Sequence, residues 1–209
     1  MKICIVMLYT PNISSYSKIT EQINRKYCNK WKYDFKLYDT LIPNKWATWS
    51  KLDAIKKTLF NYDYNYDYIF WIDSDAFFNN HDIQLENFIT TYDMYICDDL
   101  PNNLPGQHCI VNTGTMLIKN TKYMQDFFNI WLNYDGPYNY KPYHEQTILD
   151  YMIKNNIFNC KNKIKIHKAN TFNSIIYKFN NDDFIIHMMG MDEQSRINIA
   201  NQKLISISI

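Results

Sequence analysis

The stretch that decides the fold is Phe70-Trp71-Ile72-Asp73-Ser74-Asp75-Ala76-Phe77-Phe78, in which two carboxylates follow directly after an apolar run. Residues 68–72 form the most apolar predicted strand, which places it at the centre of a sheet covered on both faces. Side chains alternate along an extended segment, so Asp73 and Asp75 point the same way and can face one divalent ion. Aspartates at a strand end also form turns by bonding to nearby backbone amides. The pair alone therefore leaves a metal site and a plain turn both open.

Strand-like and helix-like segments alternate on both sides of this stretch, which predicts an α/β fold. No internal repeat or linker-like stretch interrupts the pattern, so we expect one domain over residues 1–209. The predicted strands are 3–9, 33–38, 68–72, 94–97, 109–119 and 184–187. In the basic stretch 161–168, Ile164 and Ile166 alternate inward, which favours the solvated face of a further strand over a contact to phosphate or an acidic glycan. The predicted helices are 16–31, 49–60, 85–90, 123–132 and 145–153.

The composition is that of a globular domain, with 46% apolar residues, 21% charged residues and a formal charge of +1. Near-zero net charge disfavours a nucleic-acid binder, although the eighteen tyrosines could serve as stacking platforms. The five cysteines include no Cys-x-x-Cys pair, which argues against a disulfide framework or a zinc ribbon and favours a reducing compartment. No apolar run approaches the roughly 18 residues that cross a bilayer. We expect a soluble, cytoplasmic protein without a signal peptide.

Several common catalytic motifs are missing from the sequence. There is no Gly-x-x-x-x-Gly-Lys phosphate loop, no Gly-x-Gly-x-x-Gly dinucleotide motif and no Gly-x-Ser-x-Gly nucleophile elbow. Nucleoside triphosphatase, dinucleotide oxidoreductase and serine hydrolase functions therefore have no support.

Three further segments carry polar groups beside scarce glycines or at element ends. Asn112 and Gly114 interrupt the apolar strand 109–119, where a glycine marks either a bulge or the close approach of a ligand. His144-Glu145-Gln146 begins a helix, which fits ordinary helix-start chemistry or polar groups gathered at the positive helix end. His187 ends an apolar strand three residues before Gly190, and a lone histidine there is either structural or a ligand.

The order of these segments resembles that of the GT-A glycosyltransferases, and most closely glycosyltransferase family 34. The motifs that carry the resemblance are Trp49-Ser50-Lys51, Trp71-Ile72-Asp73-Ser74-Asp75-Ala76, Asn112-Thr113-Gly114, Glu145-Gln146 and His187-x-x-Gly190. They span roughly residues 1 to 192. The resemblance implies a single GT-A α/β/α domain around a mixed, mostly parallel sheet.

The resemblance also implies a metal-dependent transfer of a hexose or pentose from a nucleotide-diphosphate sugar to a carbohydrate hydroxyl, with retention of configuration. In that family the Asp-x-Asp pair and the late histidine hold Mn²⁺ against the diphosphate, which maps to Asp73, Asp75 and His187. Such ligands also suit Mg²⁺. UDP is the commoner nucleotide partner of Asp-x-Asp sites, and the acceptor implied is a glycan or glycoconjugate.

The remaining site residues follow from the same resemblance. Asn112, Glu145 and Gln146 are expected to meet the transferred sugar, with Gln146 on the face away from the leaving group. The Tyr-rich loop 134–143, which holds Tyr138, Tyr140 and Tyr143, either contacts the acceptor or simply packs. The donor is expected to contact Leu8, Tyr9 and Thr10 at the base, Ser74 at the ribose, Lys51 at the phosphates, and also Asp39, Asp98 and Gly190.

The sequence departs from the family at three places. Relatives carry a lysine shortly after His-x-x-Gly, but Met191-Asp192-Glu193 follow here, so either Arg196 or Lys51 with the metal must hold the diphosphate. His144 and Glu145 replace the two aspartates of plant relatives, which leaves the donor sugar open. The membrane anchor and stem of Golgi relatives are absent, which favours a viral or parasite enzyme. These changes keep a second hypothesis open, a catalytically inactive nucleotide-sugar or glycan binder on the same scaffold.

Overall fold

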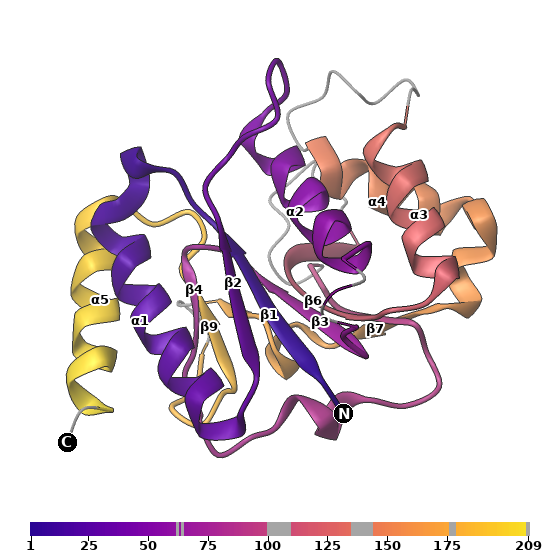
Figure 1. The fold of residues 1–209 in the computed structure, drawn as a ribbon. Coiled ribbons are helices and arrows are strands. Elements are labelled where there is room, and N and C mark those ends of the chain that lie inside the picture. The colour runs from indigo at the N-terminus through magenta and orange to yellow at the C-terminus, as the bar shows by residue number, and fades with distance from the viewer. Residues whose placement is uncertain (62, 64, 100–109, 135–143, 176–178, 208–209) are drawn as a thin grey trace.

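A six-stranded sheet with the order β2-β1-β3-β6-β5-β7 runs through the middle of the molecule (Figure 1). The computed structural model describes residues 1–61, 63, 65–99, 110–134, 144–175 and 179–207. Only β6 runs antiparallel to its neighbours in this sheet. The predicted mixed, mostly parallel sheet is confirmed. Its strands are β1 (Ile3–Leu8), β2 (Asp34–Tyr38), β3 (Tyr68–Ile72), β5 (Met94–Asp98), β6 (Val111–Lys119) and β7 (Ile164–His167).

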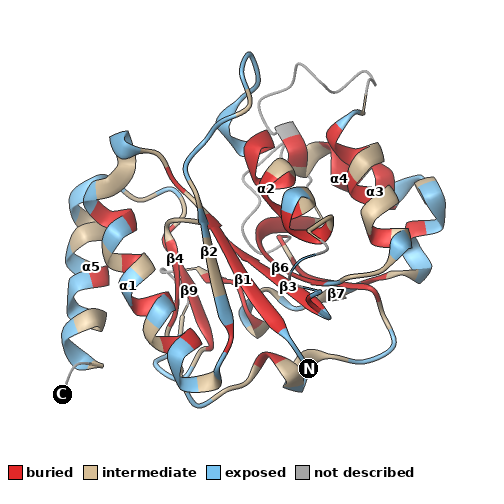
Figure 2. Cartoon of the chain, viewed as in Figure 1, coloured by how far each residue is buried: buried red, intermediate tan, exposed pale blue. Residues whose placement is uncertain are grey.

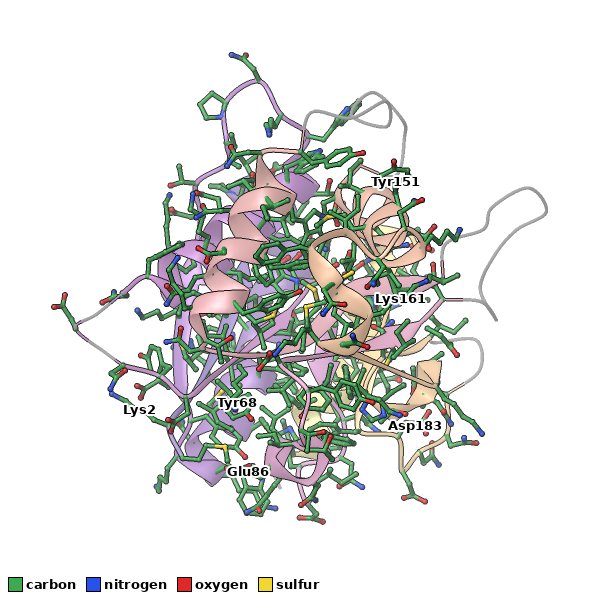
Figure 3. All side chains as sticks on the ribbon, turned by 90° about the vertical axis from the view of Figure 1, so that its right-hand side faces the viewer. Lys2, Tyr68, Glu86, Tyr151, Lys161 and Asp183 are labelled. Atoms are coloured by element: carbon green, nitrogen blue, oxygen red, sulfur yellow. The ribbon has the colours of Figure 1, made fainter. Side chains whose placement is uncertain are left out.

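Helices cover both faces of this sheet, which explains why its central strands are apolar throughout. All five residues of β3 are buried (Figure 2). One face packs against α2 (Ser50–Leu59), α3 (Lys122–Leu132) and α4 (His144–Lys154). Seen from the side of α3 and α4, closely packed side chains fill the space between these helices and the sheet, with Tyr151 of α4 near the top of the view and Glu86 near the bottom (Figure 3).

A second, three-stranded sheet with the order β4-β9-β8 packs on the opposite face. Its strands are β4 (Ala76–Phe78), β8 (Ser174–Ile175) and β9 (Ile185–His187). The helix α1 (Ser14–Trp31) lies against it, and α5 (Glu193–Ser206) packs beside α1 (Figure 1). Short 3-10 helices occupy Pro11–Ile13, Ala47–Trp49, Leu85–Phe88, Ile157–Asn162 and Ala169–Thr171.

The structure adds elements that the periodicity did not predict, namely β4, β8 and α5. β4 and β8 contain three and two residues, too few to show an alternating pattern. Ala200 is the only fully buried residue of α5, and Ile199 and Leu204 pack partly buried against the same cluster, so the apolar face of this helix is narrow. Asp192 caps the helix by accepting a hydrogen bond from the Ser195 backbone N–H at 2.9 Å. The helix predicted at 85–90 is a 3-10 turn, Leu85–Phe88. None of the described helices is both long and apolar enough to span a membrane.

Gly114 does not end β6, but the pairing with β5 is interrupted around it. Ile96 of β5 pairs with Met116, whereas the next residue, Cys97, pairs with Asn112. The intervening residues 113–115 leave the ladder on that side while Thr115 still pairs with Ile72 of β3. This irregularity turns the backbone around Gly114 toward the carboxyl end of β3, where Asp73 donates its backbone N–H to the Gly114 carbonyl at 2.8 Å. Cys109, which was predicted to start this strand, lies outside the described residues.

Candidate functional site

Two carboxylates and one imidazole meet where β3 ends and β4 begins. Asp73 follows β3, Asp75 precedes β4, and His187 ends β9, whose antiparallel pairing with β4 sets His187 opposite Ala76. The three side chains offer ligand atoms that all lie within 4.8 Å of one another. His187 Nε2 lies 3.2 Å from Asp75 Oδ1 and 4.0 Å from Asp73 Oδ2. Oxygen and imidazole ligands of this kind suit Mn²⁺.

A hydrogen bond to Asn173 fixes the His187 ring in an orientation that suits a metal ligand. His187 Nδ1 donates to the Asn173 side-chain oxygen at 2.9 Å, and Nε2 faces the carboxylates. Metal-binding histidines commonly have one ring nitrogen fixed by such a hydrogen bond while the other binds the ion. The residues present therefore fit a divalent cation.

The charges gathered at this site shift the pKa values of Asp75 and His187 in opposite directions. Burial by itself would raise the pKa of Asp75, but His187 and Arg196 hold it at about 2. Burial by itself would lower the pKa of His187, but Asp75 and Asp73 raise it above its ordinary value. The acids therefore favour the protonated form of the imidazole, and a divalent ion would replace the proton on Nε2.

Gly114 makes room for the histidine. A Cβ at this position would lie 2.3 Å from His187 Cε1 and 2.6 Å from Nδ1. No side chain tolerates such distances without displacing the ring or the strand. The glycine in this strand therefore serves the close approach of a side chain from β9.

Lys51 of α2 is buried between the carboxylates of Asp73 and Glu145. Its Nζ lies 3.0 Å from Asp73 Oδ1 and 3.2 Å from Glu145 Oε1. Burial by itself would lower the pKa of Lys51, but the two carboxylates raise it above its ordinary value. Asp73 Oδ1 also accepts a hydrogen bond from Trp71 Nε1 at 2.7 Å. Lys51 Nζ also donates to Asp73 Oδ2, the oxygen that faces His187, at 3.2 Å, so Lys51 contacts both oxygens of this carboxylate.

A second polar cluster joins β6, α4 and the end of β5. Gln146 Oε1 accepts from the Thr113 backbone N–H at 3.0 Å, and its Nε2 donates to Asp99 Oδ2 at 3.2 Å. Asn112 Nδ2 donates to the other oxygen of Asp99 at 3.1 Å. The structure thus brings Asn112 and Gln146 together around the Asp99 carboxylate, which the sequence interpretation missed.

A pocket of about 210 Å³ opens beside the acids. Of the predicted donor contacts, Leu8, Tyr9, Thr10, Lys51 and Ser74 line it together with Asp73 and Asp75. Apart from Lys51 of α2, these residues lie at the carboxyl ends of β1 and β3, the edge at which open α/β sheets bind ligands.

The sequence matches the model of one protein family over residues 2–100 and 104–198, and that family is described as the galactosyl transferase GMA12/MNN10 family. The chain belongs to this glycosyltransferase family. The resemblance to family 34 is confirmed, and with it the enzyme class. No protein of curated function matches the sequence significantly.

Solved structures with this fold are also glycosyltransferases. A glycosyltransferase involved in glycosylation of the major capsid of PBCV-1 superimposes with a TM-score of 0.77 at 18% identity, covering 97% of this chain and 100% of that one. The galactosyltransferase LgtC, in complex with donor and acceptor sugar analogs, gives 0.59 at 13% identity with 95% of each chain covered. A Drosophila β-1,4-galactosyltransferase 7 variant with manganese, UDP-Gal and xylobiose gives 0.52 at 11%, covering 94% and 74%. The GT-A fold is confirmed.

Some residues predicted for this glycosyltransferase lie away from the pocket. Asp39 is exposed after β2, where it accepts a hydrogen bond from the Thr40 hydroxyl at 3.0 Å. Asp98 accepts from the Ala169 backbone N–H at 3.0 Å, and its neighbour Asp99 faces Gln146 instead. Neither Asp39 nor Asp98 lines the pocket as formed by the described residues. Gly190 has a φ of 76° with open space where a Cβ would be. Tyr138, Tyr140 and Tyr143 lie outside the described residues.

Arg196 joins the site from α5, an element that the periodicity did not predict. It lines the pocket and pairs with Asp75 Oδ2 at 3.0 Å. Its Nε donates to the Met188 carbonyl at 3.2 Å, and its guanidinium lies 4.9 Å from the centre of the Tyr16 ring. The signal in the sequence was composition, because Arg196 is one of two arginines among 22 basic residues. An arginine fork binds phosphate in a way that lysine does not.

Proposed function

We propose that residues 1–209 act as one domain that transfers a hexose or pentose from a nucleotide-diphosphate sugar, preferably a UDP-sugar, to a carbohydrate hydroxyl with retention of configuration. Asp73, Asp75 and His187 would hold Mn²⁺ or Mg²⁺. The observation that carries this proposal is the cluster of these three side chains, two of which, Asp73 and Asp75, line a pocket at the carboxyl edge of the sheet. The manganese and UDP-Gal bound by the Drosophila relative support it.

The bound cation would stabilise the negative charge that develops on the departing diphosphate. The protein's own contribution on that side is Arg196, whose guanidinium faces the pocket beside Asp75. The Lys51 ammonium is surrounded by Asp73, Glu145 and Thr113. This difference favours Arg196 over Lys51 as the diphosphate contact.

The nucleoside would lie against the end of β1. Tyr9 is mostly buried and donates its hydroxyl to Glu21 at 2.5 Å, which fixes the ring at the pocket wall. Burial and Glu21 raise the pKa of Tyr9 to about 12, so this hydroxyl remains a donor. A fixed aromatic ring beside apolar Leu8 offers a flat surface for a base, and Ser74 lies on the route toward the acids, where the ribose would lie.

The transferred sugar would meet the cluster of Asn112, Gln146 and Asp99. Three buried or half-buried polar side chains offer both donors and acceptors there, as recognition of sugar hydroxyls requires. An oxocarbenium-like centre would be stabilised by the Gln146 oxygen and the Asp99 carboxylate on this side. Direct front-face attack by the acceptor needs no dedicated base, which fits retention without a separate catalytic acid.

A thermal-shift panel of UDP- and GDP-sugars, each with Mn²⁺ or EDTA, tests the proposal, because a ligand of the folded state raises the melting temperature. We expect a metal-dependent shift with one UDP-sugar that is lost in Asp75→Ala and His187→Ala. No shift with any donor would contradict the nucleotide-sugar function. A donor that binds with Mn²⁺ but is neither transferred nor hydrolysed would identify an inactive binding protein instead.

A further inference from the structure

We propose that Glu145 and Lys51 form one buried positioning pair that orients the Asp73 carboxylate toward the cation, so that Glu145 acts on the metal site through Lys51 and does not contact the transferred sugar. This inference rests on the proposed function, since it assumes a cation at Asp73, Asp75 and His187. It assigns to Glu145 a role different from the sugar contact expected from the family resemblance.

The first argument is the saturation of the Lys51 ammonium. An ammonium has three N–H donors. Acceptors on three different residues surround Nζ: Asp73 at 3.0 Å, Glu145 at 3.2 Å and the Thr113 carbonyl at 3.3 Å. With 5% of the residue exposed, Lys51 has all its hydrogen-bonding capacity directed into the protein. The Lys51 ammonium therefore binds protein groups and has no donor left for a phosphate.

The second argument is the fixed position of Glu145. Only 3% of the residue is exposed, and it does not line the pocket formed by the described residues. Thr113 Oγ1 donates to its Oε1 at 2.9 Å, the same oxygen that faces Lys51. Its backbone carbonyl accepts from Trp131 Nε1 of α3 at 2.8 Å. These contacts fix the Glu145 carboxylate against Lys51.

The third argument is charge. Lys51 and Glu145 together are neutral, so the negative charge of Asp73 remains available to a cation. If Glu145 were uncharged, a buried ammonium would lie 3.0 Å from Asp73 with no second anionic partner and would compete with the metal for this ligand. Substitution of a residue that hydrogen-bonds to a metal ligand commonly lowers metal affinity by roughly 10- to 100-fold.

The test measures Mn²⁺ binding to the whole chain without nucleotide or sugar, using the EPR signal of free Mn²⁺. Glu145→Gln keeps the shape and removes the charge, and we expect roughly 10- to 100-fold weaker binding. In a Lys51→Met background, the same Glu145 substitution is expected to cause no further loss. Lys57→Met is the matched control, because Lys57 lies on the exposed side of the same helix and pairs with Asp53 at 2.7 Å.

Unchanged Mn²⁺ affinity in Glu145→Gln, with a raised KM for the donor, would overturn the inference and return Glu145 to the sugar. A full Glu145→Gln effect in the Lys51→Met background would overturn it as well. If Glu145→Gln does not fold, Glu145→Asp replaces it; this variant keeps the charge but shortens its reach, and unchanged Mn²⁺ affinity there would also overturn the inference. Failure of the unsubstituted protein to bind Mn²⁺ would instead refute the proposed metal site, which separates the two results.

Discussion

A methyl group at position 114 would occupy space that the His187 ring now fills, with 2.3 Å between the added Cβ and Cε1. We expect Gly114→Ala to weaken Mn²⁺ binding at least tenfold and to lower the free energy of unfolding by about 1–3 kcal/mol, as overpacking does. Mn²⁺ titration and urea unfolding measure the two effects. Gly190→Ala is the control: it strains a positive φ but meets no atom within 4 Å, so Mn²⁺ affinity should persist. Equal Mn²⁺ affinity in both variants would contradict this account of Gly114.

The raised pKa of His187 makes metal binding dependent on pH. The cation requires the neutral imidazole, so Mn²⁺ affinity should rise with pH until pH exceeds the pKa of His187 in the folded protein. Without metal, His187 instead makes the stability of the fold decrease as pH rises. The charged histidine stabilises the fold fully below its unfolded value of 6.5, and this contribution is lost as pH rises through the higher folded pKa. Asp75, with its pKa lowered to about 2, stabilises the fold above 3.8 and loses that effect as pH falls toward 2.

Melting temperatures measured from pH 6 to 9 should therefore fall in EDTA, relative to His187→Ala, and rise in excess Mn²⁺. His187→Ala removes the titrating group and should remove both slopes. A melting temperature that rises with pH in EDTA, relative to the same variant, would contradict the assignment of a charged histidine to the metal-free site.

At the scale of the element, α5 contributes Arg196 to the pocket and holds it through the Asp75 pair and the Met188 carbonyl. We expect Arg196→Ala to weaken UDP binding in the presence of Mn²⁺ by roughly 10- to 100-fold, because a charge-assisted contact to the diphosphate is lost. Calorimetric titration with UDP measures this. Mn²⁺ affinity without nucleotide should be equal or higher, since the arginine no longer competes for Asp75. If Arg196→Ala binds UDP as tightly as the unsubstituted protein does, other groups bind the diphosphate and this role of Arg196 is contradicted.

The helices and central strands were predictable because each carries its own pattern. The spacing of Tyr16, Ile23 and Tyr27 predicted α1, and all three residues are buried on it. The apolar run 68–72 predicted β3 at the centre of the sheet. The short strand β4 could not be predicted, because three apolar residues after the two aspartates have no periodicity. It exists because it pairs with β9 and packs on α1, where the Asn24 side chain binds Ala76 and Phe78.

At the scale of the whole molecule, the core between the two sheets is largely aromatic. Phe78 is fully buried and stacks on Tyr27 of α1 with 3.8 Å between ring centres. We expect Phe78→Ala to lower the free energy of unfolding by about 3–5 kcal/mol, since it leaves a cavity where β4, α1 and β3 meet. Chemical denaturation measures this. Ile205→Ala on the exposed side of α5, where the side chain is 64% exposed, should change stability by less than about 0.5 kcal/mol. Similar losses in both variants would contradict this description of the core.

The site was predictable only in part, for a related reason. Asp73 and Asp75 follow a strand whose pattern is visible, but strand alternation was the wrong reason for their alignment. A turn brings the two carboxylates together, closed by the hydrogen bond from the Ala76 backbone N–H to the Asp73 carbonyl at 3.0 Å. The register at the end of β5 was not visible. After the pairing shift at Ile96, Asp99 faces Gln146, whereas Asp98, which was expected to contact the donor, accepts a hydrogen bond from the Ala169 backbone N–H. Alternation along a regular strand does not predict such a shift.

The sequence by itself determined the alternation of strands and helices, the two carboxylates at the end of the central strand, and the family motifs. These features depend on periodicity and chemistry within a few residues. Only the tertiary structure decided that His187 meets Asp75 across 112 positions, that Lys51 is enclosed by Asp73 and Glu145, and that Arg196 enters the pocket from α5. The partners of a polar side chain depend on how distant elements pack and on which buried charges must be balanced. The local sequence pattern predicts neither.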